Sequence, residues 1–191
     1  MKKVLSLMLL TVFVSGLALA SDPDMKKFEN FTLEDYNGVK HSLADYKDAK
    51  AIVLMFIATQ CPVSNAYNER MAELYADYKG KNVAFVGVNS NKQESIEEIK
   101  EHAKKNGLEF TILKDWNNTI ADRFDAQFTP EIYVLNSKSL ELMYHGRIDN
   151  SRRMEEVKEK DLRRALDEIL GGKEVSVSTT KAFGCTIKRV S

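Results

Sequence analysis

The segment from Phe56 to Ser64 holds the residues with the clearest capacity for chemistry. Cys61 follows an apolar run that predicts a buried strand, and Pro62 comes directly after it. Proline is favoured at the first position of a helix, so the pattern places the Cys61 sulfur at a helix N-terminus, where free N–H groups stabilise a thiolate. Ser64 is close enough for its hydroxyl to donate to that sulfur. We therefore predict a nucleophilic thiolate; the alternative is a small buried apolar side chain.

The apolar periodicity along the chain predicts the elements that position Cys61. Continuous apolar runs at 51–57 and 83–88 are typical of strands covered on both faces of a parallel sheet. Asn37-Gly38 predicts a tight hairpin turn in which both residues have positive φ. The other expected elements are hairpin strands at 31–33 and 39–43, helices at about 62–78, 93–106, 117–124 and 154–170, and strands at 110–113, 132–135 and 140–148. This order predicts an α/β sandwich.

The first twenty residues have the parts of a secretory signal. Lys2 and Lys3 precede an apolar run from Val4 to Leu17, and the stretch ends in small residues at Ala18 and Ala20. We expect a signal peptide at 1–20, a folded domain at 21–172 and a tail at 173–191, in a protein exported to a bacterial periplasm or otherwise exported. A membrane anchor is the alternative, but the apolar run is shorter than the roughly 20 residues that span a bilayer, so we expect no stable membrane insertion after cleavage.

Composition restricts the class of partner. The chain has 191 residues, 43% of them hydrophobic, which is enough for a substantial core. Its 28 basic and 28 acidic residues give a formal net charge of zero. Nucleic acid is excluded as an expected partner because no basic stripe is available to pair with phosphates.

The Cys61 segment resembles the active-site stretch Phe-x-Ala-Thr-x-Cys-Pro-x-Cys of a known family. That family is the alkyl hydroperoxide reductase/thiol-specific antioxidant group, together with the exported thioredoxins of cytochrome maturation; the matching residues are Phe56, Ala58, Thr59, Cys61 and Pro62. The resemblance implies a thioredoxin-like α/β fold, with a mixed central sheet flanked by helices, an N-terminal hairpin and an irregular C-terminal tail. It also implies a cis bond before Pro130, which would pack beside Cys61 and shape the partner groove.

The departures from this family bear on the activity. Ser64 stands where the second cysteine of the motif would be, so a Cys-x-x-Cys disulfide cannot form. Peroxiredoxins carry Pro-x-x-x-Thr-x-x-Cys, and here Leu54 and Ala58 replace the proline and the threonine. The chain is most similar to the peroxiredoxin-like, or redoxin, group with a Cys-Pro-Val-Ser-Asn segment and a Gly-Cys-x-Ile-Lys tail, and we expect weak or no peroxidase activity.

Cys185 is the second cysteine of the chain and lies in that tail. A tail that leaves the last helix can fold back over the active-site edge and bring Cys185 to Cys61. Cys185 would then resolve an oxidised Cys61, with Lys181, Lys188 and Arg189 favouring its thiolate. The alternative is a permanent structural disulfide between the same two cysteines. Both interpretations remain open from the sequence.

Two further residues are candidates for the site. The turn after the last strand of a thioredoxin fold lies beside the cis-proline, so the resemblance places Arg147 near Cys61, where it would stabilise a thiolate or sulfenate. His145 is a candidate proton carrier. His41 and His102 are expected to be solvated, and three scattered histidines predict no metal site.

Together these features predict an exported thiol–disulfide oxidoreductase. Cys61 is the expected nucleophile and Cys185 the resolving thiol, with Ser64, Pro130 and Arg147 as supporting site residues. Protein or small-molecule disulfides are the expected substrates, with peroxides as a second candidate, and a thiol reductant regenerates the protein without a cofactor. The rival hypothesis is a non-catalytic binding module with a structural Cys61–Cys185 disulfide.

Overall fold

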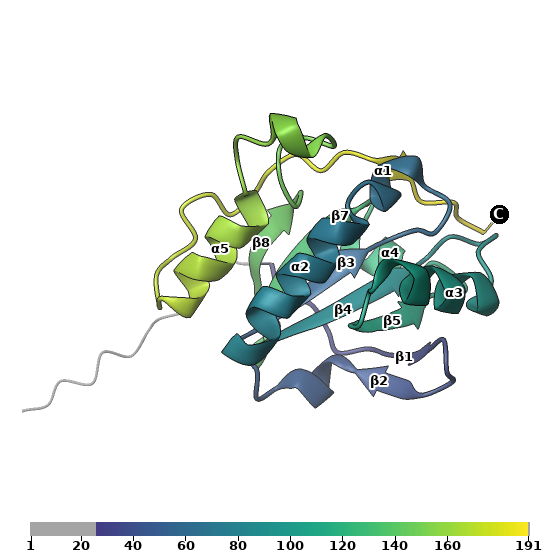
Figure 1. The fold of residues 1–191 in the computed structure, drawn as a ribbon. Coiled ribbons are helices and arrows are strands. Elements are labelled where there is room, and N and C mark those ends of the chain that lie inside the picture. The colour runs from purple at the N-terminus through teal and green to yellow at the C-terminus, as the bar shows by residue number, and fades with distance from the viewer. Residues whose placement is uncertain (1–25, 191) are drawn as a thin grey trace, which may run out of the picture.

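A seven-stranded mixed sheet runs through the computed structural model, which describes residues 26–190 (Figure 1). The strand order is β2-β1-β5-β4-β3-β7-β8, in which β3, β4 and β5 are parallel and the remaining pairings are antiparallel. The strands are β1 (Thr32–Asp35), β2 (Lys40–Ser42), β3 (Ala51–Phe56), β4 (Val83–Asn89), β5 (Thr111–Lys114), β7 (Glu131–Asn136) and β8 (Leu142–Gly146). A separate antiparallel pair joins β6 (Phe128–Thr129) to β9 (Cys185–Thr186).

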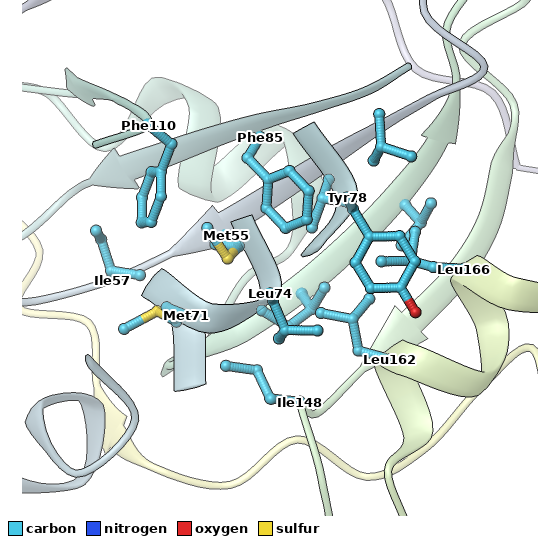
Figure 2. Packing of buried hydrophobic residues seen from close by; sticks show 14 of the residues in the cluster. Met55, Ile57, Met71, Leu74, Tyr78, Phe85, Phe110, Ile148, Leu162 and Leu166 are labelled. Atoms are coloured by element: carbon cyan, nitrogen blue, oxygen red, sulfur yellow. The ribbon is translucent and has the colours of Figure 1, made fainter. Parts of the chain in front are cut away.

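Side chains from β3 enter two cores because both faces of the sheet are covered. Val53 and Met55 pack in one core with residues of α2 (Asn68–Tyr78), α3 (Ile96–Asn106) and α5 (Asp161–Leu170). Figure 2 shows Met55 in this core, with Leu74 of α2 and Leu162 of α5. Leu54 and Phe56 pack in the other with α4 (Thr119–Phe124) and Phe28. All six residues of β3 are buried. The predicted α/β sandwich and its continuous apolar strands are therefore confirmed.

Two predicted helices are each divided in two. The helix expected at 62–78 is α1 (Pro62–Asn65) followed by α2, and the break lies at the buried Tyr67. There the Tyr67 hydroxyl donates to Asp149 at 3.1 Å, and the Tyr67 ring lies under the Arg70 guanidinium. The helix is thus interrupted at a residue whose side chain is held by tertiary contacts. The helix expected at 154–170 is a 3-10 turn, η3 (Met154–Glu156), followed by α5.

The segment before α5 is extended because the Asn150 side chain takes its N–H groups. Asn150 Oδ1 accepts from the N–H groups of Lys158 and Glu159, at 2.8 and 3.0 Å, so these donors are not available to a helix. Two more 3-10 turns, η1 (Leu43–Tyr46) and η2 (Lys79–Lys81), connect elements elsewhere.

The N-terminal hairpin forms as predicted, but its turn differs. Only Gly38 has positive φ, at 80°, whereas Asn37 does not. The Gly38 N–H donates to the Asp35 carbonyl, and the Asp35 carboxylate accepts from the N–H groups of Asn37 and Val39. This geometry is a longer turn closed by a left-handed glycine, which the Asp35 side chain stabilises.

The tail after α5 returns across the end of the sheet where β3 stops, and in Figure 1 it passes α1. The predicted signal peptide at 1–20 lies outside the described residues. Within residues 26–190, no helix has both the length and the apolar character needed to cross a membrane.

Candidate functional site

Cys61 is the N-cap residue of α1, directly after the loop that leaves β3. Pro62 occupies the first turn, and the backbone N–H of Ser64 donates to Cys61 Sγ at 3.2 Å. The hydrogen bond expected from the Ser64 hydroxyl to the sulfur stays a prediction; in the structure the oxygen of that hydroxyl accepts from the Ala58 N–H at 3.2 Å. The buried Ser64 side chain therefore ties α1 to the loop, while its backbone supplies the donor to sulfur.

Cys61 and Cys185 form a disulfide, which confirms that the two cysteines meet. They are 124 positions apart in the sequence, and their Cα atoms are 5.9 Å apart. Cys185 lies on β9, opposite Thr129 of β6. Cys61 is only 4% exposed, whereas Cys185 is partly exposed. We call residues 185–190 the tail strap.

The cis bond predicted before Pro130 is present, and the carbonyl before it lies beside the disulfide. The Thr129–Pro130 bond is cis, and the Thr129 carbonyl oxygen lies 3.3 Å from Cys61 Sγ. Gly184 reaches the same carbonyl from the tail: a Cβ atom at Gly184 would collide with the Thr129 oxygen. Backbone from two distant parts of the chain is thus in close contact around the Cys61 sulfur.

Glu94 is a site residue that the sequence did not reveal. It is fully buried, and its carboxylate accepts from the N–H groups of Thr59 and Gln60, at 2.7 and 3.1 Å, in the loop just before Cys61. The side chains of Asn89 and Asn91 donate to the same carboxylate. Glu94 thereby holds the active-site loop against the end of β4. It stands in a polar stretch, and no motif marks it.

Glu131 is a second buried carboxylate, adjacent to Pro130. It accepts from the N–H groups of Gln127 and Phe128, and His145 Nε2 lies 2.7 Å from its Oε1. Burial alone would raise the pKa of Glu131, but the hydrogen bonds from His145 and from the two backbone groups hold it below its ordinary value. His145 is therefore a partner of Glu131.

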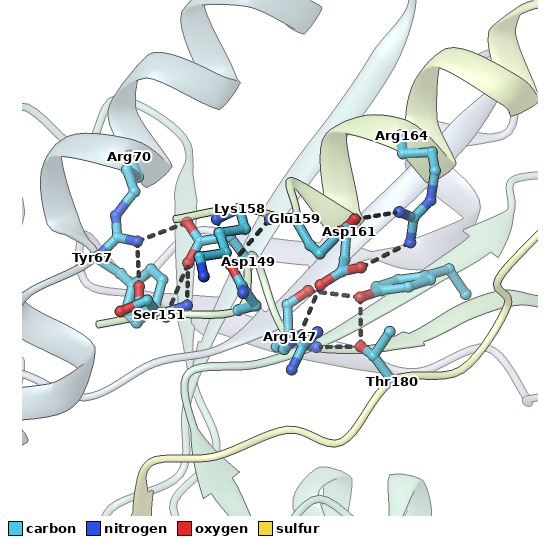
Figure 3. A network of polar contacts seen from close by, with 12 residues as sticks. Tyr67, Arg70, Arg147, Asp149, Ser151, Lys158, Glu159, Asp161, Arg164 and Thr180 are labelled. Atoms are coloured by element: carbon cyan, nitrogen blue, oxygen red, sulfur yellow. Dashed lines mark hydrogen bonds and ion pairs between the residues drawn. The ribbon is translucent and has the colours of Figure 1, made fainter. Parts of the chain in front are cut away.

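Arg147 contacts Asp161 on α5 and Thr180 on the tail (Figure 3). Its Nε donates to the Asp161 carboxylate at 2.7 Å, and its backbone N–H donates to the Thr180 hydroxyl at 3.1 Å. Among residues 26–190, no hydrogen bond or ion pair links Arg147 to Cys61. The Tyr144 hydroxyl also pairs with Thr180, at 2.7 Å, so this cluster fixes the start of the tail rather than the disulfide.

The other histidines have protein partners rather than being solvated. His41 Nε2 lies 3.2 Å from Asp35, and His102 pairs with Asn68. Burial lowers the pKa of His102. In the described part of the chain, no three His, Cys, Asp or Glu side chains are grouped so that they could hold a metal ion.

Comparison with known proteins supports a redoxin assignment. The profile of the AhpC/TSA family matches residues 25–143. The thiol-disulfide oxidoreductase ResA of Bacillus subtilis is 31% identical over 107 residues, 56% of this chain and 58% of that protein. A chloroplastic peroxiredoxin Q of Populus jackii is 27% identical, over 66% of this chain and 62% of that protein. The chain thus spans about three-fifths of the length of these curated relatives.

Solved structures extend the likeness over more of the chain. The hypothetical protein SMc02350 of Sinorhizobium meliloti is 31% identical and superposes with a TM-score of 0.81 over 90% of this chain and 97% of its own. More distant solved structures of thioredoxin-like proteins share the fold, which confirms the predicted fold class. With its matched profile over more than half of its length, the chain belongs to the AhpC/TSA family.

Proposed function

We propose that the protein is an exported thiol–disulfide oxidoreductase in which Cys61 is the nucleophile and Cys185 the resolving thiol. The observation that carries the proposal is the disulfide between a helix-N-terminal cysteine and a cysteine on the tail. The similarity to ResA supports the reaction class, and the leader at 1–20 supports export.

The reaction proceeds in two exchanges that conserve electrons. The reduced Cys61 thiolate attacks a substrate disulfide, so the substrate S–S bond breaks, one substrate thiolate leaves and a mixed disulfide forms on Cys61. Cys185, as its thiolate, then attacks Cys61 Sγ and releases the second substrate thiol, which leaves the Cys61–Cys185 disulfide. A thiol reductant supplies two electrons to restore both thiols.

Two features of the site suit this sequence of steps. The Ser64 N–H donates to Cys61 Sγ, and such a donor stabilises a thiolate. A stabilised thiolate is also the better leaving group when the disulfide is reduced. Cys185 on β9 pairs in strand register with Thr129 on β6. This pairing fixes the direction from which the Cys185 sulfur approaches Cys61.

Peroxide is the weaker candidate substrate. Ala58 has no hydroxyl to orient a peroxide, and its N–H already donates to the Ser64 hydroxyl. Loss of one preorganised donor in a transition state typically costs about 10²–10³ in rate. We therefore propose that disulfide exchange is the principal activity.

The second candidate is a non-catalytic module with a permanent disulfide. The burial of Cys61 and the several contacts of the tail strap favour it. The two proposals differ in whether the disulfide of the folded protein can be reduced, and an aromatic disulfide such as 5,5′-dithiobis(2-nitrobenzoate) then shows whether Cys185 resolves an adduct on Cys61.

This reagent provides the test. If Cys185 resolves, reduced wild-type protein releases two thionitrobenzoate anions and ends with the Cys61–Cys185 bond, whereas Cys185→Ser releases one anion and keeps the adduct on Cys61. Intact mass separates these products. Stable adducts on both cysteines of the wild type would refute the resolving role. A native disulfide that dithiothreitol reduces only in denaturant would establish the structural module instead.

A further inference from the structure

The tail strap is bound to the domain by more than the disulfide. The Ile187 N–H donates to the Gln127 carbonyl at 2.9 Å, and the Lys188 N–H donates to Asn91 Oδ1 at 2.7 Å. The Lys188 carbonyl accepts from the Lys92 N–H at 2.8 Å. These contacts lie on the loop after β4 and the segment before β6, so they do not depend on the sulfur–sulfur bond.

Asn91 joins the strap to the loop that carries Cys61. Its Oδ1 accepts from the strap at Lys188, and its Nδ2 donates to Glu94 Oε1 at 2.8 Å. The same Glu94 carboxylate holds the N–H groups of Thr59 and Gln60. One uninterrupted series of hydrogen bonds therefore runs from the strap, through two side chains, to the residues just before Cys61.

The two side chains that make this connection, Asn91 and Glu94, are buried, which strengthens their hydrogen bonds. Asn91 is 4% exposed and Glu94 is 0% exposed, so neither side chain has water available as a substitute partner. A buried donor or acceptor that loses its partner keeps the full cost of its desolvation. With the strap docked, Asn91 Oδ1 accepts from the Lys188 N–H where water does not compete for that oxygen, so this bond favours the docked strap.

We propose that Asn91 and Glu94 are positioning residues that keep the tail strap docked when the disulfide is reduced, so that Cys185 stays beside Cys61. The role of this docking rests on the proposed exchange function. A docked Cys185 can attack a mixed disulfide on Cys61 directly, whereas an undocked tail would first have to return to the site. The docking itself is measurable in the absence of any substrate, so it stands or falls independently of turnover.

The test is amide hydrogen exchange of residues 185–190 in the fully reduced, full-length protein. Asn91→Ala removes both hydrogen bonds of the side chain, and one such bond corresponds to about a fivefold change in an opening equilibrium. We expect strap exchange to rise by at least about fivefold. Ser137→Ala is the matched control, since it removes a buried hydroxyl that bonds the Ala49 carbonyl at the opposite end of β3; its strap should exchange like the wild type.

A double substitution at positions 91 and 94 distinguishes the loss of a specific hydrogen bond from a general loss of structure. Asn91→Asp keeps the acceptor for Lys188 but sets two carboxylates against each other, and exchange should rise. Adding Glu94→Gln supplies a donor for the new carboxylate at position 91, at the cost of the acceptor that Glu94 Oε1 provides for the Gln60 N–H, so protection should recover in part. If Asn91→Ala does not fold, Lys188→Pro removes the strap's N–H donor at an exposed residue, with Lys188→Ala as the control for the loss of the side chain that bonds Thr186.

Three results would overturn the proposal. One is a wild-type strap that exchanges at the rate of unstructured chain once the disulfide is reduced. Another is equal strap exchange in Asn91→Ala, Ser137→Ala and the wild type. The third is a double variant that is no better protected than Asn91→Asp.

Discussion

Removal of the Cys61–Cys185 bond should lower the stability of the domain by a large and calculable amount. The two cysteines are 124 positions apart, and the chain-entropy relation for a closed loop of that length gives about 5 kcal/mol at 25 °C. For a chain of this size, 1 kcal/mol corresponds to roughly 2–4 °C in Tm, so the predicted loss is about 10–20 °C. The disulfide lowers the conformational entropy of the unfolded chain rather than that of the folded one. Its removal should therefore reduce stability even though hydrogen bonds keep the strap docked in the folded protein.

Differential scanning calorimetry on three samples measures this loss. The oxidised wild type should have the highest Tm, whereas reduced wild type and Cys185→Ser should coincide at the lower value. Reductant should not change the Tm of Cys185→Ser, which controls for effects of the reagent. A difference below about 3 °C between oxidised and reduced protein, with one transition in each, would refute the reasoning that the bond restricts the unfolded chain.

Three more predictions follow from the site. In reduced protein at neutral pH, iodoacetamide should label Cys61 well before Cys185, because only Cys61 has a helix N-terminal N–H donor at its sulfur; peptide mass spectrometry reads the order, and equal slow labelling would contradict it. Hydrogen peroxide should oxidise Cys61 slowly in stopped-flow trapping experiments, and Ala58→Thr alone should not accelerate it, because the preceding proline of peroxiredoxins is also replaced. The pKa of Glu131 is lowered in the folded protein, so the stability that the Glu131 carboxylate contributes is present above the ordinary value of about 4.5 and is lost as pH falls through the folded pKa. Glu131→Gln should therefore reduce the pH dependence of the free energy of unfolding, measured by urea unfolding between pH 3 and 6.

The long strands were predictable from the sequence for a physical reason. Burial on both faces leaves uninterrupted apolar runs, and 51–56 and 83–89 carry them. The cis bond at Pro130 followed from resemblance to a family, whereas the meeting of Cys61 with Cys185 followed from a tail that can fold back over the end of the sheet; the structure contains both. No local pattern would have specified either contact.

The remaining features depend on tertiary contacts that leave no local trace. β6 and β9 have two residues each, which is too short for any periodicity. Glu94 lies among polar neighbours, a pattern typical of exposed residues, yet the folded chain surrounds it with donors from two segments, 59–60 and 89–91. Arg147 was placed beside the sulfur by analogy, but Asp161 on α5 supplies a carboxylate at 2.7 Å.

The contact of Gly184 with the Thr129 carbonyl makes the pairing of the two cysteines depend on a residue that has no side chain of its own. A single methyl group at position 184 would occupy the space of that carbonyl oxygen and displace the chain that presents Cys185. Both cysteines would still be present in the sequence, but they would behave as two unrelated thiols.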